Sequence, residues 1–266
     1  MSAIRVMTDD DEKSSPIGAI ALAALAIVVA LFTVKFGLQT LTWVEGKMWA
    51  AQTSWLKVVP QTLPAPAAAP VLTAKTPQIK AYDFEVVAPW PGNPKAVPTE
   101  TSVAFHYDTG QVLVFFDPEA QLDTLRSIQN SNPLEYQKFS NVFADKPIDS
   151  NYALYREVYS ASPAQLSPFM DARDAMRLNV LLLWKLSFGP DLSPESGFYS
   201  FDWNTIRGFQ FGDPAKGAPV ALRAFDDRGH QFRFMLSTAP GATGKITQDD
   251  VDKILQTVQP VPFADR

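Results

Sequence analysis

The side chains that most often carry catalysis or hold metals are scarce in this chain. It contains no cysteine and two histidines, His106 and His230. Thiolate nucleophiles, disulfides and zinc–thiolate sites are therefore excluded. Each histidine lies next to a predicted hairpin turn, so a catalytic or metal-binding pair would require the two hairpins to be adjacent. We expect each histidine instead to be an ordinary strand residue at the rim of a sheet.

One segment has the location that a phosphate-binding loop requires. Residues 239–247 (APGATGKIT) connect a predicted strand to a predicted helix. The segment lacks the first glycine at the required distance, and Ile246 replaces the serine or threonine that would hold Mg²⁺. The chain also lacks the dinucleotide, serine-hydrolase, zinc-protease and calcium-loop motifs. We therefore predict no catalytic residue, cofactor or metal, and we interpret residues 239–247 as a connector.

Three arginines form the polar cluster for which the sequence suggests a role. Arg207, Arg223 and Arg233 lie on three predicted strands, and a three-residue turn between the last two strands sets Arg223 opposite Arg233. Together they predict an exposed basic sheet face. Such a face could receive an acidic partner or a lipid headgroup. The alternative is a solvated sheet face without a ligand.

The composition argues against nucleic acid as a main partner. The chain of 266 residues carries a formal net charge of −5 and has a pI of about 5.1. Binding to a phosphate backbone requires clustered lysine and arginine, which this acidic balance does not favour. Hydrophobic residues make up 46% of the chain, so an ordinary hydrophobic core can form without disulfides.

An apolar segment near the N-terminus predicts a transmembrane helix. Residues 16–36 read PIGAIALAALAIVVALFTVKF, and Lys35 is the only charged residue among them. About 20 such residues span the hydrocarbon core of a bilayer as a helix. The alternative is a cleaved signal peptide, but the apolar stretch is longer than the usual signal core. Residues 1–15 then form an N-terminal tail.

One face of this predicted helix is lined by small residues at alternating steps of four and three. Such a stripe allows a second helix to approach closely. It continues at coiled-coil spacing into a predicted juxtamembrane helix over residues 37–59. The alternative is that alanine is simply abundant and that Trp43, Trp49 and Trp55 form an interfacial belt. We predict that residues 16–59 contact a membrane protein or a second copy of the chain. The predicted helix-pairing face consists of Ala19, Ala23, Ala26, Ala30, Thr33 and Gly37.

The charges around the apolar segment leave its orientation open, since Arg5 and Lys13 precede it and Lys35 and Lys47 lie at or beyond its end. A short N-terminal tail before a spanning helix usually remains in the cytoplasm. The Pro/Ala-rich residues 60–80 suit a semi-extended linker that carries a domain away from the membrane. We therefore expect a single-pass protein of a bacterial inner membrane, with a cytoplasmic N-terminus and a periplasmic C-terminal domain.

The pattern of residues 81–266 predicts a soluble domain that contains two β-hairpins. The first hairpin comprises Thr101–Tyr107 and Gln111–Asp117, joined by an Asp-Thr-Gly turn. This turn sets Val103 opposite Phe115 and Phe105 opposite Leu113. The second comprises Val220–Phe225 and Gln231–Ser237, with Leu222 opposite Phe234. Two further strands are expected after Gly197. Whether the hairpins join one sheet stays open at this level.

Helices are predicted from capping signals and apolar periodicity. Ser162 and Gln165 form a capping box, and Ser167 offers a second helix start one turn later. The run LNVLLLWKLSF at residues 178–188 is apolar nearly all round, so we expect the central buried helix there. Thr247 with Asp250 predicts a final capped helix. The predicted helices cover residues 118–130, 150–160, 167–188 and 247–259.

The fold class predicted by this pattern is α+β: an N-terminal transmembrane helix followed by antiparallel hairpins and about four helices. A hairpin followed by a capped helix occurs twice, which either an internal duplication or coincidence explains. A tether, a spacer and a large domain without a chemical signature favour a non-enzymatic subunit, adaptor or assembly factor of a membrane complex. The alternative is a tethered ligand-binding or sensor domain, which requires a concave pocket.

Overall fold

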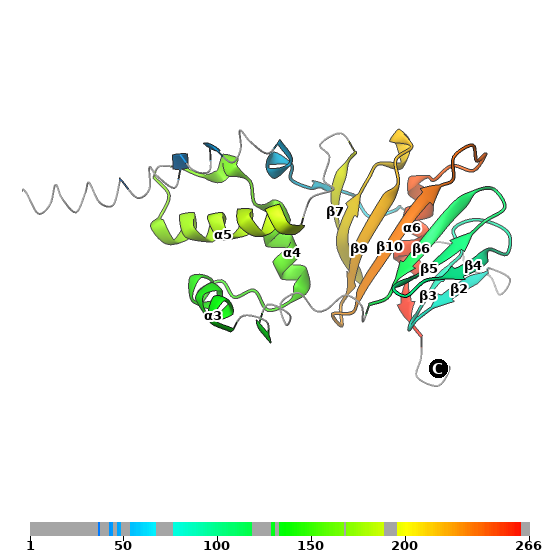
Figure 1. Cartoon of the computed structure of the whole chain (residues 1–266), viewed down its shortest axis with the longest axis horizontal. Coiled ribbons are helices and arrows are strands. Elements are labelled where there is room, and N and C mark those ends of the chain that lie inside the picture. Colours follow the sequence, from blue (N-terminus) through cyan, green and yellow to red (C-terminus); the bar gives the residue numbers. More distant parts are fainter. Residues whose placement is uncertain are drawn as a thin grey trace, which may run out of the picture.

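The computed structural model of the chain is shown in Figure 1. It describes residues 37, 43–44, 47–48, 54–67, 77–118, 129–130, 133–167, 169–188 and 196–261. The predicted tail and the predicted transmembrane helix lie outside these residues. Within the described ranges, none of the helices combines the length and the apolar character that a membrane crossing requires. Gly37, Trp43, Val44, Lys47 and Met48, from the predicted juxtamembrane helix, are helical.

The fold is α+β, as predicted, and is built on one large sheet. Its eight strands run in the order β1-β7-β8-β9-β10-β6-β5-β4. All neighbouring strands are antiparallel except β1 and β7, which are parallel. The strands are β1 (Gln61–Thr62), β4 (Lys95–Pro98), β5 (Ser102–His106), β6 (Gln111–Phe116), β7 (Phe198–Trp203), β8 (Ile206–Phe211), β9 (Val220–Asp226) and β10 (Gln231–Thr238).

Both predicted hairpins form with the predicted register. Val103 pairs with Phe115 in the first hairpin, and Leu222 pairs with Phe234 in the second. The register follows from the turn, because a three-residue loop with glycine in the left-handed conformation permits one alignment of the flanking strands. β10 then pairs with β6, so both hairpins belong to a single sheet.

A small sheet and a helix cover one face of the large sheet. Strands β2 (Gln78–Ala81), β3 (Phe84–Val87) and β11 (Gln259–Pro260) form the small sheet, and α6 (Gln248–Thr257) lies beside them (Figure 1). Thr247 and Asp250 form the predicted capping box at the start of α6. Buried residues such as Leu222, Phe234 and Ile254 make one continuous core between these elements.

A helical layer covers the other face of the large sheet toward β7, β8 and β9 (Figure 1). Aromatic rings from the sheet, among them Phe209 and Phe225, pack there against the tyrosines of α4. Arg177 joins two helices, because its Nε donates a hydrogen bond of 2.8 Å to the carbonyl oxygen of Val142. The layer contains η1 (Ser54–Lys57), α3 (Pro133–Val142), α4 (Asn151–Ser160), η2 (Pro163–Gln165) and α5 (Ala172–Phe188), and η3 (Pro214–Lys216) follows β8.

The predicted helix boundaries are only partly correct. α4 begins where expected, with Ser150 capping the N–H of Ala153. The capping box of Ser162 and Gln165 also forms, but it starts a three-residue 3₁₀ turn rather than a long helix. Most of the predicted helix over residues 118–130 lies outside the described residues. Gln129 and Asn130, at its end, are described and are helical.

The prediction that the run 178–188 forms the central buried helix is wrong. α5 packs on α3, α4 and η1, and its outer side is exposed, with Met176 at 55% and Leu183 at 48%. The reason is that α4 occupies the sheet face. The tyrosine rings of α4 pack against the phenylalanine rings of the sheet. α5 packs on α4, on the side away from the sheet.

A close approach between β8 and β9 depends on Gly208. A Cβ atom at this position would overlap the carbonyl oxygen of Arg223, which cannot move because it belongs to the neighbouring strand. We expect Gly208→Ala to lower the free energy of unfolding by about 3 kcal/mol, from overpacking against a rigid backbone. Gly217→Ala is the matched control: its Cβ would meet open space, so it should cost only about 1 kcal/mol, from placing an alanine in the left-handed conformation. Chemical denaturation of both variants checks this, and equal costs would contradict it.

Candidate functional site

The predicted helix-pairing face lies outside the described residues, apart from Gly37. Gly37 is helical and exposed, and none of the described residues lies within 4 Å of a Cβ built on it. The pairing of residues 16–59 with a partner remains a prediction.

The two histidines do not meet, although their hairpins are adjacent. His106 pairs with Val112 at one end of the sheet. His230 comes just before β10, which begins at Gln231. The other end of β10, at Thr238, pairs with Gln111 and therefore lies at the end of the sheet where His106 lies. The histidines therefore lie at opposite ends of the sheet. A shared catalytic or metal site would need both at one end.

Residues 239–247 are fastened to the first hairpin. The Gly244 N–H donates to the carbonyl oxygen of Thr109 at 3.0 Å, and the Gln111 side-chain amide donates to the carbonyl oxygen of Lys245 at 2.8 Å. A phosphate-binding loop presents its backbone N–H groups to the ligand. Here Gly244 uses its N–H for a contact within the fold. The arrangement is that of a connector.

The three predicted arginines share one face of the large sheet, and the helical layer covers that face. Arg223 on β9 pairs with Arg233 on β10, and Arg207 on β8 lies diagonally from Arg223. All three are half-buried rather than fully exposed, because α4 packs above them. The guanidinium carbon of Arg223 lies 3.9 Å from the centre of the Tyr155 ring, and that of Arg207 lies 4.4 Å from the centre of the Tyr152 ring.

The electrostatic environment of this arginine cluster is repulsive. Burial lowers the pKa of Arg233, and the neighbouring charge of Arg223 lowers it further. Burial raises the pKa of Tyr159 to about 12, so this phenol stays neutral and accepts a hydrogen bond of 3.3 Å from Arg223. The Nε atoms of Arg207 and Arg223 are buried without a hydrogen-bond partner.

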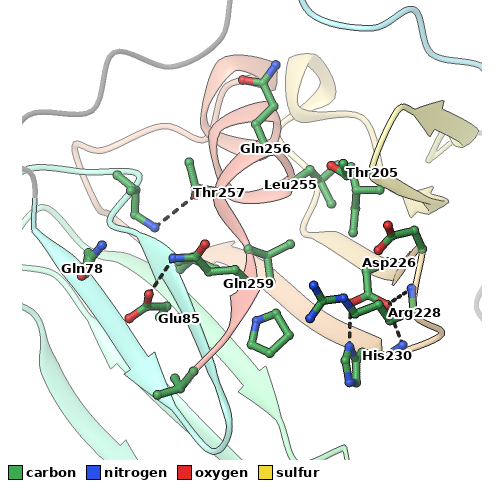
Figure 2. A pocket seen from close by; sticks show the side chains of 17 residues that line it. Gln78, Glu85, Thr205, Asp226, Arg228, His230, Leu255, Gln256, Thr257 and Gln259 are labelled. Carbon is green, nitrogen blue, oxygen red and sulfur yellow. Dashed lines mark hydrogen bonds and ion pairs between the residues drawn. The ribbon is translucent and has the colours of Figure 1, made fainter. Parts of the chain in front are cut away.

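A groove with a volume of about 770 Å³ lies between the C-terminal segment and the β9–β10 hairpin (Figure 2). Ile206, Leu255 and Val258 contribute apolar lining. This is the size range of small-molecule sites. Its walls come from α6, β11, β3 and the turn before β10, which lie far apart in the sequence.

The polar groups of the groove are largely occupied with each other. Gln259 donates to Glu85 at 2.6 Å, and Lys80 pairs with the same carboxylate at 3.2 Å. Asp226 binds His230 Nδ1 at 2.6 Å and also accepts the backbone N–H of His230. These contacts stabilise the turn and the small sheet. Metal binding lacks support within the described ranges, because histidine and the acidic residues form no cluster of three there.

Lys185 is a buried charged side chain that the sequence pattern did not single out. It is 0% exposed, and none of the described acidic residues forms an ion pair with it. Its ammonium donates to three backbone carbonyl oxygens: 2.6 Å to Val58, 3.1 Å to Tyr159 and 2.6 Å to Ala161. Tyr159 and Ala161 end α4, so the helix dipole also favours a cation there. The available signal was a single lysine inside an apolar run.

The contact with Val58 fastens the segment that follows the predicted transmembrane helix to the helical layer. Leu56 is fully buried in the same core, and Trp43, Trp55 and Val58 pack against it. We call residues 54–63 the tether junction. The junction includes β1, which lies at the edge of the sheet. Just after β1, the Leu63 N–H donates to the Ser200 carbonyl oxygen at 2.8 Å. The predicted linker at residues 60–80 therefore begins as a bound edge strand.

A search of protein-family models finds no match to this chain, and comparisons with curated proteins and with solved structures likewise find none.

Lys185 should make the stability of the fold depend on pH. Burial lowers its pKa from 10.5 to about 8, so between these values the unfolded chain binds more protons than the folded one. Stability from this group rises as the pH increases, by about 2 kcal/mol between pH 8 and pH 10. Urea denaturation of the detergent-solubilised chain and of Lys185→Met measures the difference. We expect it to grow with pH in that window. A difference independent of pH would contradict the lowered pKa.

Proposed function

We propose that this chain is a membrane-anchored, non-enzymatic subunit, adaptor or assembly factor of a membrane protein complex, with its folded domain in the periplasm. The observation that carries the proposal is the tether junction. Lys185 and Leu56 hold the segment that follows the predicted transmembrane helix against the helical layer. A junction held in this way supports positioning of the domain relative to a membrane partner. A free linker would serve a domain that acts alone.

Exposed apolar side chains on the helical layer offer a contact surface for such a partner. Some of the large apolar residues that keep more than a third of their surface exposed lie on α3, on α5 and on the turn before α5. Interface cores are depleted in charged residues, and these five side chains are all uncharged. The residues are Leu134, Phe169, Met176, Leu183 and Leu186.

The proposal predicts that membrane proteins co-purify with the full-length chain through its small-residue face. Ala23→Leu combined with Ala30→Leu adds bulk where a second helix should approach, so recovery of a partner should fall roughly tenfold, a loss of about 1.4 kcal/mol. The measurement is mass spectrometry of the chain isolated by a C-terminal tag from mild detergent.

Ala21→Leu with Ala24→Leu is the matched control, because it makes the same exchange off the predicted face. It should retain the partner. A truncation that starts at residue 37, which keeps the tether junction, should lose it. Recovery of the wild-type chain without other membrane proteins, or only paired with itself, would contradict the complex role.

A second candidate, a tethered ligand-binding or sensor domain, is favoured by the groove of about 770 Å³. Thr205 lines this groove from an exposed turn, so Thr205→Trp should obstruct it while leaving the core intact. Native mass spectrometry of the wild-type chain should then detect a bound small molecule that the variant lacks. Thr101→Trp, on an exposed turn away from the groove, is the control. An unliganded wild-type chain would argue against this candidate.

A further inference from the structure

The arginine cluster on the sheet contains two like charges that face each other. Arg223 and Arg233 are directly opposite each other on neighbouring strands, and Arg207 lies diagonally from Arg223. Asp202 is the cross-strand neighbour of Arg207. In the part of the chain that the structure describes, none of the three arginines forms an ion pair with an acidic residue.

This arrangement is costly for the fold. Like charges directly opposite each other across two strands are destabilising, and partial burial removes part of the water that would screen them. Hydrogen bonding inside the fold is also incomplete, because the Nε atoms of Arg207 and Arg223 are buried without a partner. The cluster therefore destabilises the free protein, which is typical of residues kept for binding rather than for stability.

The tyrosines of α4 hold the arginine side chains in place. Arg223 stacks on Tyr155 and donates to the hydroxyl of Tyr159, and Arg207 stacks on Tyr152. Stacking orients a guanidinium without neutralising it, so its charge and its remaining N–H groups stay available. The guanidinium groups of Arg207 and Arg223 are therefore in position before any ligand arrives, and that of Arg233 lies over the Phe116 ring, 5.2 Å from its centre.

We propose that Arg223 and Arg233, with Arg207 beside them, bind a phosphate group. Guanidinium groups match the geometry of phosphate and bind it through paired hydrogen bonds. A phosphate carries roughly one to two negative charges, enough to neutralise the opposed pair. The group would come from a phospholipid headgroup or from a soluble phosphate. The site does not depend on the proposed membrane-complex role.

The test is thermal unfolding of the full-length chain in a maltoside detergent, which contains no phosphate, with inorganic phosphate titrated against chloride at equal ionic strength. Phosphate should raise the Tm of the wild-type chain by about 3 °C or more. Arg223→Gln with Arg233→Gln should abolish this rise. In phosphate-free buffer the same variant should melt at or above the wild-type temperature, because the repulsion is gone. An arginine pair with a purely structural role would instead lower the Tm when removed.

Lys95→Gln with Lys245→Gln is the matched control, since it removes two exposed positive charges elsewhere. It should keep the phosphate-dependent rise. A wild-type Tm that phosphate leaves unchanged, or an equal loss in the control, would overturn the proposal. If the double arginine variant does not fold, Arg233→Lys keeps the charge but loses the paired geometry, and should weaken phosphate binding about fivefold.

Nanodiscs that contain phosphatidylglycerol distinguish the sources of the phosphate. A Tm rise without added phosphate, abolished by the double arginine variant, assigns the site to a lipid headgroup. A rise that requires soluble phosphate assigns it to a free ligand. A polyglutamate peptide that stabilises the chain when phosphate does not would overturn the proposal and assign the face to an acidic protein.

Discussion

The pairing of β6 with β10 is the constraint on which the rest of the structure depends. It joins two locally specified hairpins into one large sheet and thereby decides which side chains share a face. One face packs against α6 and the small sheet, and the other carries Phe209, Phe225 and the opposed arginines under α4. The same pairing places His106 and His230 at opposite ends of the sheet. The separation of the two histidines follows from it, whereas the arginine cluster follows from the pairing of β9 with β8 and β10.

A buried cation, Lys185, and a half-buried one, Arg223, contribute to the helical layer in different ways. Lys185 is satisfied, because three carbonyl oxygens and the end of α4 surround its ammonium. Arg223 is held by tyrosines but is not neutralised. The satisfied cation connects the tether junction to the domain, which suits a structural role. Arg223, which pairs with none of the described acidic residues, lies on a face that still exposes part of each arginine, and this suits binding. The region around Lys185 therefore suits a structural role, and the region around Arg223 suits ligand binding.

Local patterns predicted the hairpins and caps well, because turn chemistry acts over a few residues. The register of Val103 with Phe115 follows from three turn residues, and the capping box of Thr247 follows from four. Packing between distant elements was not predictable in this way. The apolar run in α5 is consistent with a buried helix, but α4 covers the sheet because its tyrosines meet the phenylalanines there. One side of α5 is therefore exposed because α4, and not α5, packs directly on the sheet.

By itself, the amino-acid sequence determined the α+β class, the two hairpins with their registers and the alignment of Arg223 with Arg233. The hairpin registers and the arginine alignment depend on residues that lie close together in the sequence. The fold class depends on the series of such locally specified elements. Only the tertiary structure decided that the arginines are half-buried beneath tyrosines, that Lys185 binds the carbonyl oxygen of Val58, and that a groove forms beside α6. These features join segments separated by many residues. Long-range packing places such segments side by side, and local periodicity carries no information about which distant backbone carbonyl a lysine will reach.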